Sequence, residues 1–564
     1  MLLPSLVIIL AGPSLALAAS LNHGHPPSHP PKPPQAPQAK TLNGTYEGKY
    51  LSGYDQDAFL GMRYGLPTGG QLRFRRPHYV NESWTGVRSA TSYSLECPQN
   101  PSTNVFPLSQ QSEDCLALNV VRPHGTKAGD KLPVLVWIYG GGFDGGGTSD
   151  PRYNLSGIVK LSQDMGKPIV GVSINYRLNK LGFLQSLQLL SEGSANAGMH
   201  DQRLAFMWIQ ANIAAFGGNP KKVTIWGESA GAQSIGLHLH SYDGRDDGLY
   251  QAAIMESGGP VGTPLDPLTY YAGYFLRLLD AMGCTGAKDA IGCLRGVPFD
   301  RWQSATVDWS IWNPLIDGDM WLDYPGVTAA QGKFVKVPVL IGTNSDEGCS
   351  FATSGLNDET ALWQNFLNYR HYAIRPSMAK ELLKLYPDDP AHDPPYYLNP
   401  NPVVFPEKGL VWRRAAAISG DMVMVAGRRR VAEQYTQRGV KVFSYRFDAL
   451  MYGQNPKYGV NHFQNVVYSF QNISGLLGPL PQYAKDKVLS ENIGRAYISF
   501  AYDHDPNTSR GRSSTLPYWP QYNLHRPQNM VLNASHGSWV EDDTYRKKGI
   551  DYLNQVDSDL QVFS

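Results

Sequence analysis

Five short runs of apolar residues recur along the chain, and each is followed by glycine or polar residues. None of the runs shows the regular alternation of apolar and polar positions that is typical of a strand with one solvated face. Because a strand buried on both faces has no polar side, such runs predict strands of a mostly parallel sheet. The runs occupy residues 133–139, 168–175, 223–226, 337–342 and 440–447.

Helical spacing appears between these runs. Between the second and third, the apolar residues Leu204, Met207, Trp208, Ala211 and Ile213 predict a helix over 201–216. Alternating strands and helices predict an α/β fold, with helices on both faces of the sheet. No internal repeat or second boundary interrupts the pattern, so we expect residues 41–564 to form a single large domain.

The N-terminal segment predicts export. Residues 1–18 carry no charged side chain, have an apolar centre and end in the small-x-small pattern Ala16-Leu17-Ala18 of a cleaved signal peptide. A membrane-anchoring helix is the alternative, but Pro4, Gly12 and Pro13 interrupt the apolar run. Residues 19–40 are rich in proline and predict an extended tether. We therefore expect a secreted protein without a stable membrane anchor.

Export places the five cysteines in an oxidising compartment, where two disulfides among them can be arranged in fifteen ways. Local spacing favours Cys97–Cys115 and Cys284–Cys293, which leaves Cys349 free. Six N-x-Ser/Thr sequons are candidates for glycosylation. They lie at Asn43, Asn81, Asn154, Asn472, Asn507 and Asn533.

Composition narrows the class of partner. The 49 Lys and Arg residues nearly balance the 48 Asp and Glu residues, so the formal net charge is +1. This balance gives no indication of a nucleic-acid or anionic-membrane partner. Charged residues are 17% of the chain, which excludes a disordered, highly solvated protein.

A candidate nucleophile follows the third apolar run. Residues 227–231 read Gly-Glu-Ser-Ala-Gly, and a sequence that can form a helix comes next. Small residues permit a sharp turn from strand to helix, which would raise the Ser229 hydroxyl above the edge of the sheet. The alternative is an ordinary glycine turn with a capping serine.

A serine nucleophile needs a base, and the base needs an acid to orient it. Asp346 and Glu347 both follow the fourth apolar run, and spacing does not choose between them. Six histidines lie beyond this point, and His462 follows the fifth run on a glycine-containing loop. We expect His462 to be the base, and a loop histidine that only bonds its neighbours is the alternative.

The reaction also needs donors for an oxyanion. Residues 140–143 read Gly-Gly-Gly-Phe directly after the first apolar run, where backbone N–H groups can approach a substrate closely. The N–H of Ala230, after the candidate nucleophile, would add a donor. No clustered His and Cys ligand set and no phosphate-binding loop is present, so we expect no metal and no organic cofactor.

Several motifs in order make the chain resemble the type-B carboxylesterase/lipase family of α/β-hydrolases, which includes cholinesterases and fungal secreted esterases and lipases. The likeness covers nearly all of the mature chain. The motifs lie at residues 73–77 (Arg-Phe-Arg-Arg-Pro), 112–116 (Ser-Glu-Asp-Cys-Leu), 139–143 (Tyr-Gly-Gly-Gly-Phe), 216–220 (Phe-Gly-Gly-Asn-Pro), 227–231, 346–348 (Asp-Glu-Gly) and 459–462 (Gly-Val-Asn-His).

The resemblance implies roles for individual residues. Glu347 rather than Asp346 would orient His462, and Gly141, Gly142 and Ala230 would form the oxyanion hole. Cys97–Cys115 and Cys284–Cys293 match two disulfides of the family. Arg73 and Glu113 match a structural ion pair.

Our expectation for the substrate rests on the length and composition of the Cys97–Cys115 loop. Only seventeen residues separate the cysteines, most of them are polar, and Phe106 is the single aromatic residue. In the fungal lipases that the chain resembles, the equivalent loop is a long amphipathic lid, and in cholinesterases it carries a tryptophan that binds a quaternary ammonium. The loop of this sequence has neither feature. We expect a serine esterase that acts on small or medium apolar esters and not a cholinesterase.

Three alternatives remain: a lipase for longer-chain glycerides, an esterase dedicated to a fungal secondary metabolite, and a non-catalytic binding module. The sequence does not indicate an oligomeric state. Four residues are expected to contact the substrate, with plain core packing as the alternative: Phe143, Trp309, Trp312 and Leu315.

Overall fold

The computed structural model describes residues 36–562 except for 100–105, 263, 306–311, 452–453, 473–483 and 510–513. The predicted signal peptide and the predicted tether up to residue 35 lie outside the described residues. The end of the tether at residue 40 was placed too late, because Gln38–Lys40 forms strand β1 and pairs with β2 (Thr45–Glu47). With β5 (Val87–Ser89), these strands make a small three-stranded sheet.

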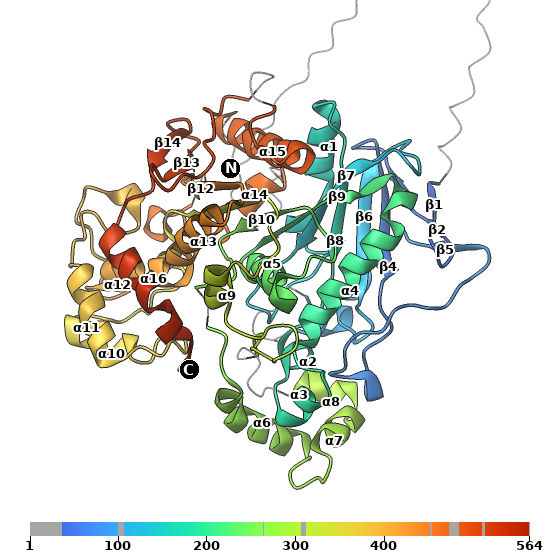
Figure 1. The fold of residues 1–564 in the computed structure, drawn as a ribbon, viewed down its shortest axis with the longest axis horizontal. Helices are drawn as coiled ribbons and strands as arrows, with labels where there is room; N and C mark the ends of the chain where they lie inside the picture. Colours follow the sequence, from blue (N-terminus) through green and yellow to red (C-terminus); the bar gives the residue numbers. More distant parts are fainter. Residues whose placement is uncertain are drawn as a thin grey trace, which may run out of the picture. The chain divides into compact units, whose positions relative to one another are not determined.

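An eleven-stranded sheet forms the centre of the fold (Figure 1). Its middle strands from β13 to β8 are parallel, and antiparallel strands close both edges. The spatial order is β14 (Trp539–Asp542), β13 (Gln528–Leu532), β12 (Val442–Phe447), β11 (Val339–Asn344), β10 (Ala252–Glu256), β9 (Gly218–Glu228), β7 (Leu132–Ile138), β8 (Val170–Ile174), β6 (Ala117–Pro123), β4 (Gln56–Arg63) and β3 (Lys49–Leu51).

The five predicted strands correspond to β7, β8, β9, β11 and β12, and their apolar runs are buried. The sequence analysis did not predict the remaining strands, including β10 in the middle of the parallel set. The predicted helix over 201–216 begins earlier, as α4 (Ala197–Asn212). It ends in a 3-10 turn, Ile213–Phe216, that Gly217 closes with a φ of 84°.

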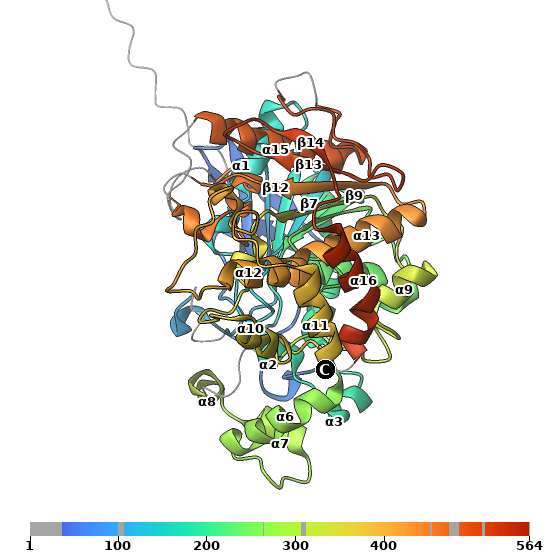
Figure 2. The same ribbon diagram turned by 90° about the vertical axis from the view of Figure 1, so that its left-hand side faces the viewer.

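Helices cover both faces of the sheet. α1 (Ser156–Asp164) and α15 (Ala484–Asp503) lie together over one face, and α4, α5 (Ala230–His240) and α13 (Ala426–Gln437) lie over the other (Figures 1 and 2). Between the sheet and the first of these layers, the rings of Trp137, Trp226 and Phe470 pack with centroids 4.4–4.7 Å apart. This aromatic cluster fixes β7 and β9, the two strands that lead to the candidate oxyanion loop and nucleophile.

Two long excursions leave the carboxyl ends of the parallel strands. The first joins β10 to β11 and contains α6 (Leu268–Met282), α7 (Ala290–Gly296), α8 (Phe299–Ser304) and α9 (Pro325–Gln331). The second joins β11 to β12 and contains α10 (Glu359–Phe366), α11 (Pro376–Leu385), α12 (Trp412–Gly420) and α13. The other helices are α2 (Asn179–Phe183), α3 (Leu187–Ser191), α14 (Val466–Ser469) and α16 (Lys547–Val562).

Both predicted disulfides are present, Cys97–Cys115 and Cys284–Cys293, and Cys349 is a free cysteine. In the described part of the chain, no helix combines the length and apolar character that crossing a bilayer requires.

The candidate glycosylation sites differ in exposure. Asn81 and Asn154 are exposed, whereas Asn43, Asn472 and Asn507 are partly buried. Asn533 is buried, and its Nδ2 donates to the backbone oxygen and the carboxylate of Asp448. Its environment does not suit a glycan acceptor.

Candidate active site

Ser229 occupies the single residue between strand β9 and helix α5. Its backbone has a φ of 56° and a ψ of −125°, a conformation that is strained for a residue with a side chain. Glycine is required on both sides. A Cβ on Gly231 would lie 2.0 Å from the Ile138 oxygen, and one on Gly227 would lie 2.8 Å from the same atom. The predicted sharp turn therefore exists, and it holds the Ser229 hydroxyl at the carboxyl edge of the sheet.

His462 reaches Ser229 from the loop after β12. Its Nε2 lies 2.9 Å from Ser229 Oγ, and its Nδ1 lies 2.7 Å from Glu347 Oε2. The structure thus brings together three side chains that are far apart in the sequence. The two ring nitrogens face the two partners that proton transfer from a serine requires.

Glu347 is buried and held by two further hydrogen bonds. Its Oε1 accepts from the backbone N–H of Asn344 at 2.7 Å and from the Ser257 hydroxyl at 2.5 Å. Ser257, which directly follows β10 and has a φ of 49°, was not predicted from the sequence. Recognition of β10 as a strand would have drawn attention to it, because functional groups gather at strand ends.

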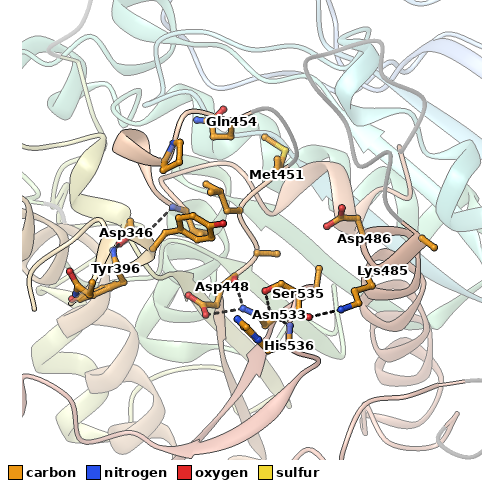
Figure 3. Close-up of a pocket in the computed structure, with 18 residues that line it drawn as sticks. Asp346, Tyr396, Asp448, Met451, Gln454, Lys485, Asp486, Asn533, Ser535 and His536 are labelled. Carbon is orange, nitrogen blue, oxygen red and sulfur yellow. Dashed lines mark hydrogen bonds between the residues drawn. The ribbon is translucent and has the colours of Figure 1, made fainter. Parts of the chain in front are cut away.

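Asp346, the other candidate acid, points away from His462. Its two carboxylate oxygens accept from the backbone N–H groups of Tyr396 and Val460, at 2.9 and 2.7 Å. It lines a different cavity of about 940 Å³, next to Tyr396 and Asp448 (Figure 3). Asp346 therefore fastens the loop that carries His462, two residues before the imidazole, and does not contact the ring.

Glu228 is a second residue that the sequence analysis missed. Its Oε1 lies 3.3 Å from His462 Nε2, and the side chain is 1% exposed. Burial raises the pKa of Glu228 to about 8. Burial lowers the pKa of His462, but the carboxylates of Glu228 and Glu347 outweigh this and raise it to about 9. The sequence did carry a signal for Glu228, because an acidic residue stands directly before Ser229 in the turn.

A cavity of about 680 Å³ opens above Ser229 and His462. The candidate oxyanion residues Gly141, Gly142 and Ala230 all line it. Gly141 and Gly142 have φ values of 93° and 65°, which other residues rarely adopt. The glycine loop is thus built to present backbone instead of side chains to the cavity.

The expected substrate contacts are only partly supported. Phe143 lines the cavity, next to Phe183 at 5.1 Å between ring centroids. Trp312 and Leu315 instead lie in the hydrophobic core at 2% exposure each, where Trp312 stacks on Tyr271. Neither residue lines the cavity. Trp309 lies outside the described residues.

The residues expected to support the fold do so. Arg73 pairs with Glu113 through Nε and Nη2, at 2.5 and 2.7 Å. Next to the Cys97–Cys115 bridge, Gln99 exchanges hydrogen bonds with the backbone of Gly146. The base of this loop is thereby joined to the glycine loop that lines the cavity.

The sheet topology, the strained serine at a strand-to-helix turn, and the histidine and glutamate after later strands define an α/β-hydrolase. The amino-acid sequence agrees with this class. Residues 35–550 match the model of the carboxylesterase family, and the chain belongs to that family. It is accordingly a carboxylic ester hydrolase.

Individual relatives cover most of the chain. Lipase 4 of Diutina rugosa is 34% identical over 89% of this chain and 93% of its own length. Secreted lipase 1 of Botryotinia fuckeliana is 34% identical over 89% of this chain and 90% of its own. Among solved structures, EstA of Aspergillus niger superposes with a TM-score of 0.81 at 27% identity, over 93% of this chain and 99% of that one. A PNB esterase superposes with a TM-score of 0.72 at 28% identity, over 92% and 100%.

Proposed function

We propose that the protein is a secreted serine esterase that uses Ser229 as nucleophile, His462 as general base and Glu347 as the acid that orients it. The observation that carries this proposal is the hydrogen-bonded line from Ser229 Oγ through both ring nitrogens of His462 to Glu347, with distances of 2.9 and 2.7 Å. Glu347 accepts three hydrogen bonds, which fix the direction of its carboxylate.

In the first step, His462 Nε2 takes the proton of Ser229 as Oγ attacks the ester carbonyl. Negative charge develops on the carbonyl oxygen, and the backbone N–H groups of Gly141, Gly142 and Ala230 would stabilise it. The tetrahedral intermediate collapses when the imidazolium gives its proton to the leaving alcohol. Glu347 orients the ring and stabilises the imidazolium.

In the second step, water replaces the alcohol. His462 takes a proton from the water, whose oxygen attacks the acyl-enzyme carbonyl, and then returns a proton to Ser229 Oγ as the carboxylic acid leaves. The same oxyanion donors serve both steps. His462 accepts and donates every proton that these two steps transfer.

Labelling with a fluorophosphonate tests the assignment of the nucleophile. We expect one adduct, on Ser229, that is lost in Ser229→Ala. Ser304→Ala, which replaces an exposed serine on α8, is the control and should keep the adduct. A non-catalytic binding module would remain unlabelled. A folded protein that never reacts would exclude the esterase.

The substrate proposal is a small or medium apolar ester, because the Cys97–Cys115 loop is short and the described cavity lies directly above Ser229. Lipase activity is the second candidate, since relatives such as Lipase 4 of Diutina rugosa carry that name. Initial rates on p-nitrophenyl butyrate, a feruloyl ester and emulsified trioctanoin separate these candidates. A strong preference for the emulsion would favour the lipase.

Secretion is proposed from residues 1–18 together with the names of two relatives, Secreted lipase 1 of Botryotinia fuckeliana and the secreted triacylglycerol lipase LIP1 of Gibberella zeae. N-terminal sequencing of protein from the culture medium tests it. We expect the mature chain to begin after Ala18, and an intact N-terminus retained in cells would contradict this.

A further inference from the structure

Two arginines line the cavity above Ser229, and only one of them is neutralised. Arg152 forms a two-pronged ion pair with Asp150, with its Nε at 3.0 Å and its Nη2 at 2.6 Å from the carboxylate. Arg370 is exposed, and within the described part of the chain it has no ion pair with a carboxylate. Its guanidinium instead lies over the ring of Phe351, with Cζ 5.1 Å from the centroid.

The guanidinium is close to the reaction centre. The ring of Phe351 packs in turn on the imidazole of His462, with centroids 4.9 Å apart. Arg370, Phe351 and His462, which all line the cavity, therefore contact one another in series, with the rings of Phe351 and His462 tilted by 54°. The charge of Arg370 reaches the imidazole, because it is one of the influences that lower the pKa of His462.

The backbone that presents Arg370 is strained and firmly anchored. Arg370 and His371 have φ values of 46° and 67°, two successive left-handed residues that are not glycine. The Tyr369 hydroxyl donates to the Phe351 oxygen on one side of the turn, and the Tyr372 hydroxyl donates to the Gly262 oxygen on the other. His371 Nε2 lies 2.8 Å from the hydroxyl of Tyr270 on α6.

Such strain persists only where surrounding contacts impose it, and it concentrates at ligand sites. Here the strained turn holds the guanidinium of Arg370 at the cavity wall. Stacking on an aromatic ring leaves the planar face of a guanidinium covered while its N–H edge stays free to bind a carboxylate or phosphate. Contact with Phe351 thus restricts the freedom that normally makes an exposed arginine a weak binding group.

We propose that Arg370 selects esters that carry an anionic group a short chain away from the scissile carbonyl. This inference rests on the proposed serine-esterase function of the same site, and it refines the substrate proposed above by adding one anionic group to an otherwise apolar ester. Glu228 also lines the cavity, but burial raises its pKa to about 8, so at neutral pH its opposing charge is reduced. Asp144 and Asp266 line the cavity as well, and Asp266 Oδ2 lies 3.6 Å from His371 Nδ1; in the described part of the chain Arg370 forms an ion pair with neither of them.

The anionic group can belong to either half of the ester, so the test has two arms. On the acyl side, mono-4-nitrophenyl adipate is compared with 4-nitrophenyl hexanoate. On the alcohol side, the butyryl ester of 6-hydroxyhexanoate is compared with hexyl butyrate in a pH-stat. In each arm the measured quantity is the ratio of kcat/KM for the charged and the neutral ester, which cancels any change in the basicity of His462.

We expect Arg370→Gln to lower this ratio by roughly three- to tenfold in at least one arm, mainly through KM, as befits one charge pair near the surface. Arg370→Lys should keep most of the preference. Arg88→Gln is the matched control, because Arg88 also stacks on an aromatic ring, Trp84 at 4.1 Å, but does not line the cavity. High salt should weaken the wild-type preference, since it screens exposed charges.

An equal ratio for the wild type and Arg370→Gln in both arms would overturn the inference while hydrolysis of the neutral esters upheld the esterase. If the wild type hydrolysed none of the four esters, the proposed function would fail, and the substrate class would fail with it. A lowered ratio in one arm identifies which half of the ester carries the anionic group.

Discussion

Replacement of Glu228 by glutamine removes a buried carboxyl group beside the general base while keeping its shape. Ionised Glu228 favours the protonated imidazole, because its Oε1 lies 3.3 Å from His462 Nε2. The reaction needs the neutral imidazole, which can accept the Ser229 proton. Glu228→Gln should therefore lower the pKa of His462 and extend activity to lower pH.

The size of the change follows from the distance. At an effective permittivity of about 20, unit charges 3.3 Å apart interact by about 5 kcal/mol, which corresponds to between three and four pKa units. Glu228 is ionised only in part near neutral pH, because burial raises its pKa to about 8. We therefore expect the acidic limb of the kcat/KM profile to move down by about one to two pH units.

The assay is the pH dependence of kcat/KM on a neutral p-nitrophenyl ester for the wild type, Glu228→Gln and Glu359→Gln. Glu359 is an exposed carboxylate that pairs with Arg414 and does not line the cavity, so its variant should keep the wild-type profile. An acidic limb that stays in place or moves upward in Glu228→Gln would refute the electrostatic reasoning.

Three further predictions concern the support of the site and the surface. Ser257→Ala removes one of the hydrogen bonds that orient Glu347 and should lower kcat about 10- to 100-fold with little change in KM, whereas an unchanged kcat would show that Ser257 is not needed to orient the acid. Asp346→Ala leaves two backbone donors without their acceptor and should lower the free energy of unfolding in urea by about 2–4 kcal/mol. Asp346→Asn keeps one acceptor oxygen and should lower it by less. Equal losses in the two variants would contradict the role given to this carboxylate. Mass spectrometry of glycopeptides should find glycans on Asn81 and Asn154 and none on Asn533, whose amide is occupied by Asp448, and a glycan on Asn533 would mean that this contact is absent in the secreted protein.

The sequence predicted the parts of the fold that leave a strong local pattern. Strands such as β7 and β11 are long apolar runs, so burial on both faces is visible in their composition. The strand β10 was missed because Ala-Ala-Ile-Met-Glu is short and has few β-branched residues. Its location depends on pairing with β9 and β11, which is information held in the rest of the molecule.

The residues of the candidate site also differ in how far the sequence predicts them. Ser229 and His462 could be named as candidates because each stands in a recognisable motif after a strand, whereas the choice of Glu347 over Asp346 came only from the resemblance to the family. Which way a side chain points was not visible, so Trp312 was expected in the cavity although it stacks on Tyr271 in the core. The stack of Arg370 on Phe351 likewise depends on a turn whose backbone conformation has no simple sequence signature.

The two excursions from the sheet separate chemistry from recognition. Ser229 directly follows β9 and Glu347 lies three residues after the end of β11, whereas much of the cavity wall comes from Asp266 and Asn313 in the first excursion and from Arg370 and Met424 in the second. A change of residue or length in either excursion can thus alter which ester fits while the reacting groups keep their places. Libraries that seek new selectivity in this scaffold should vary these two segments and leave the strand ends untouched.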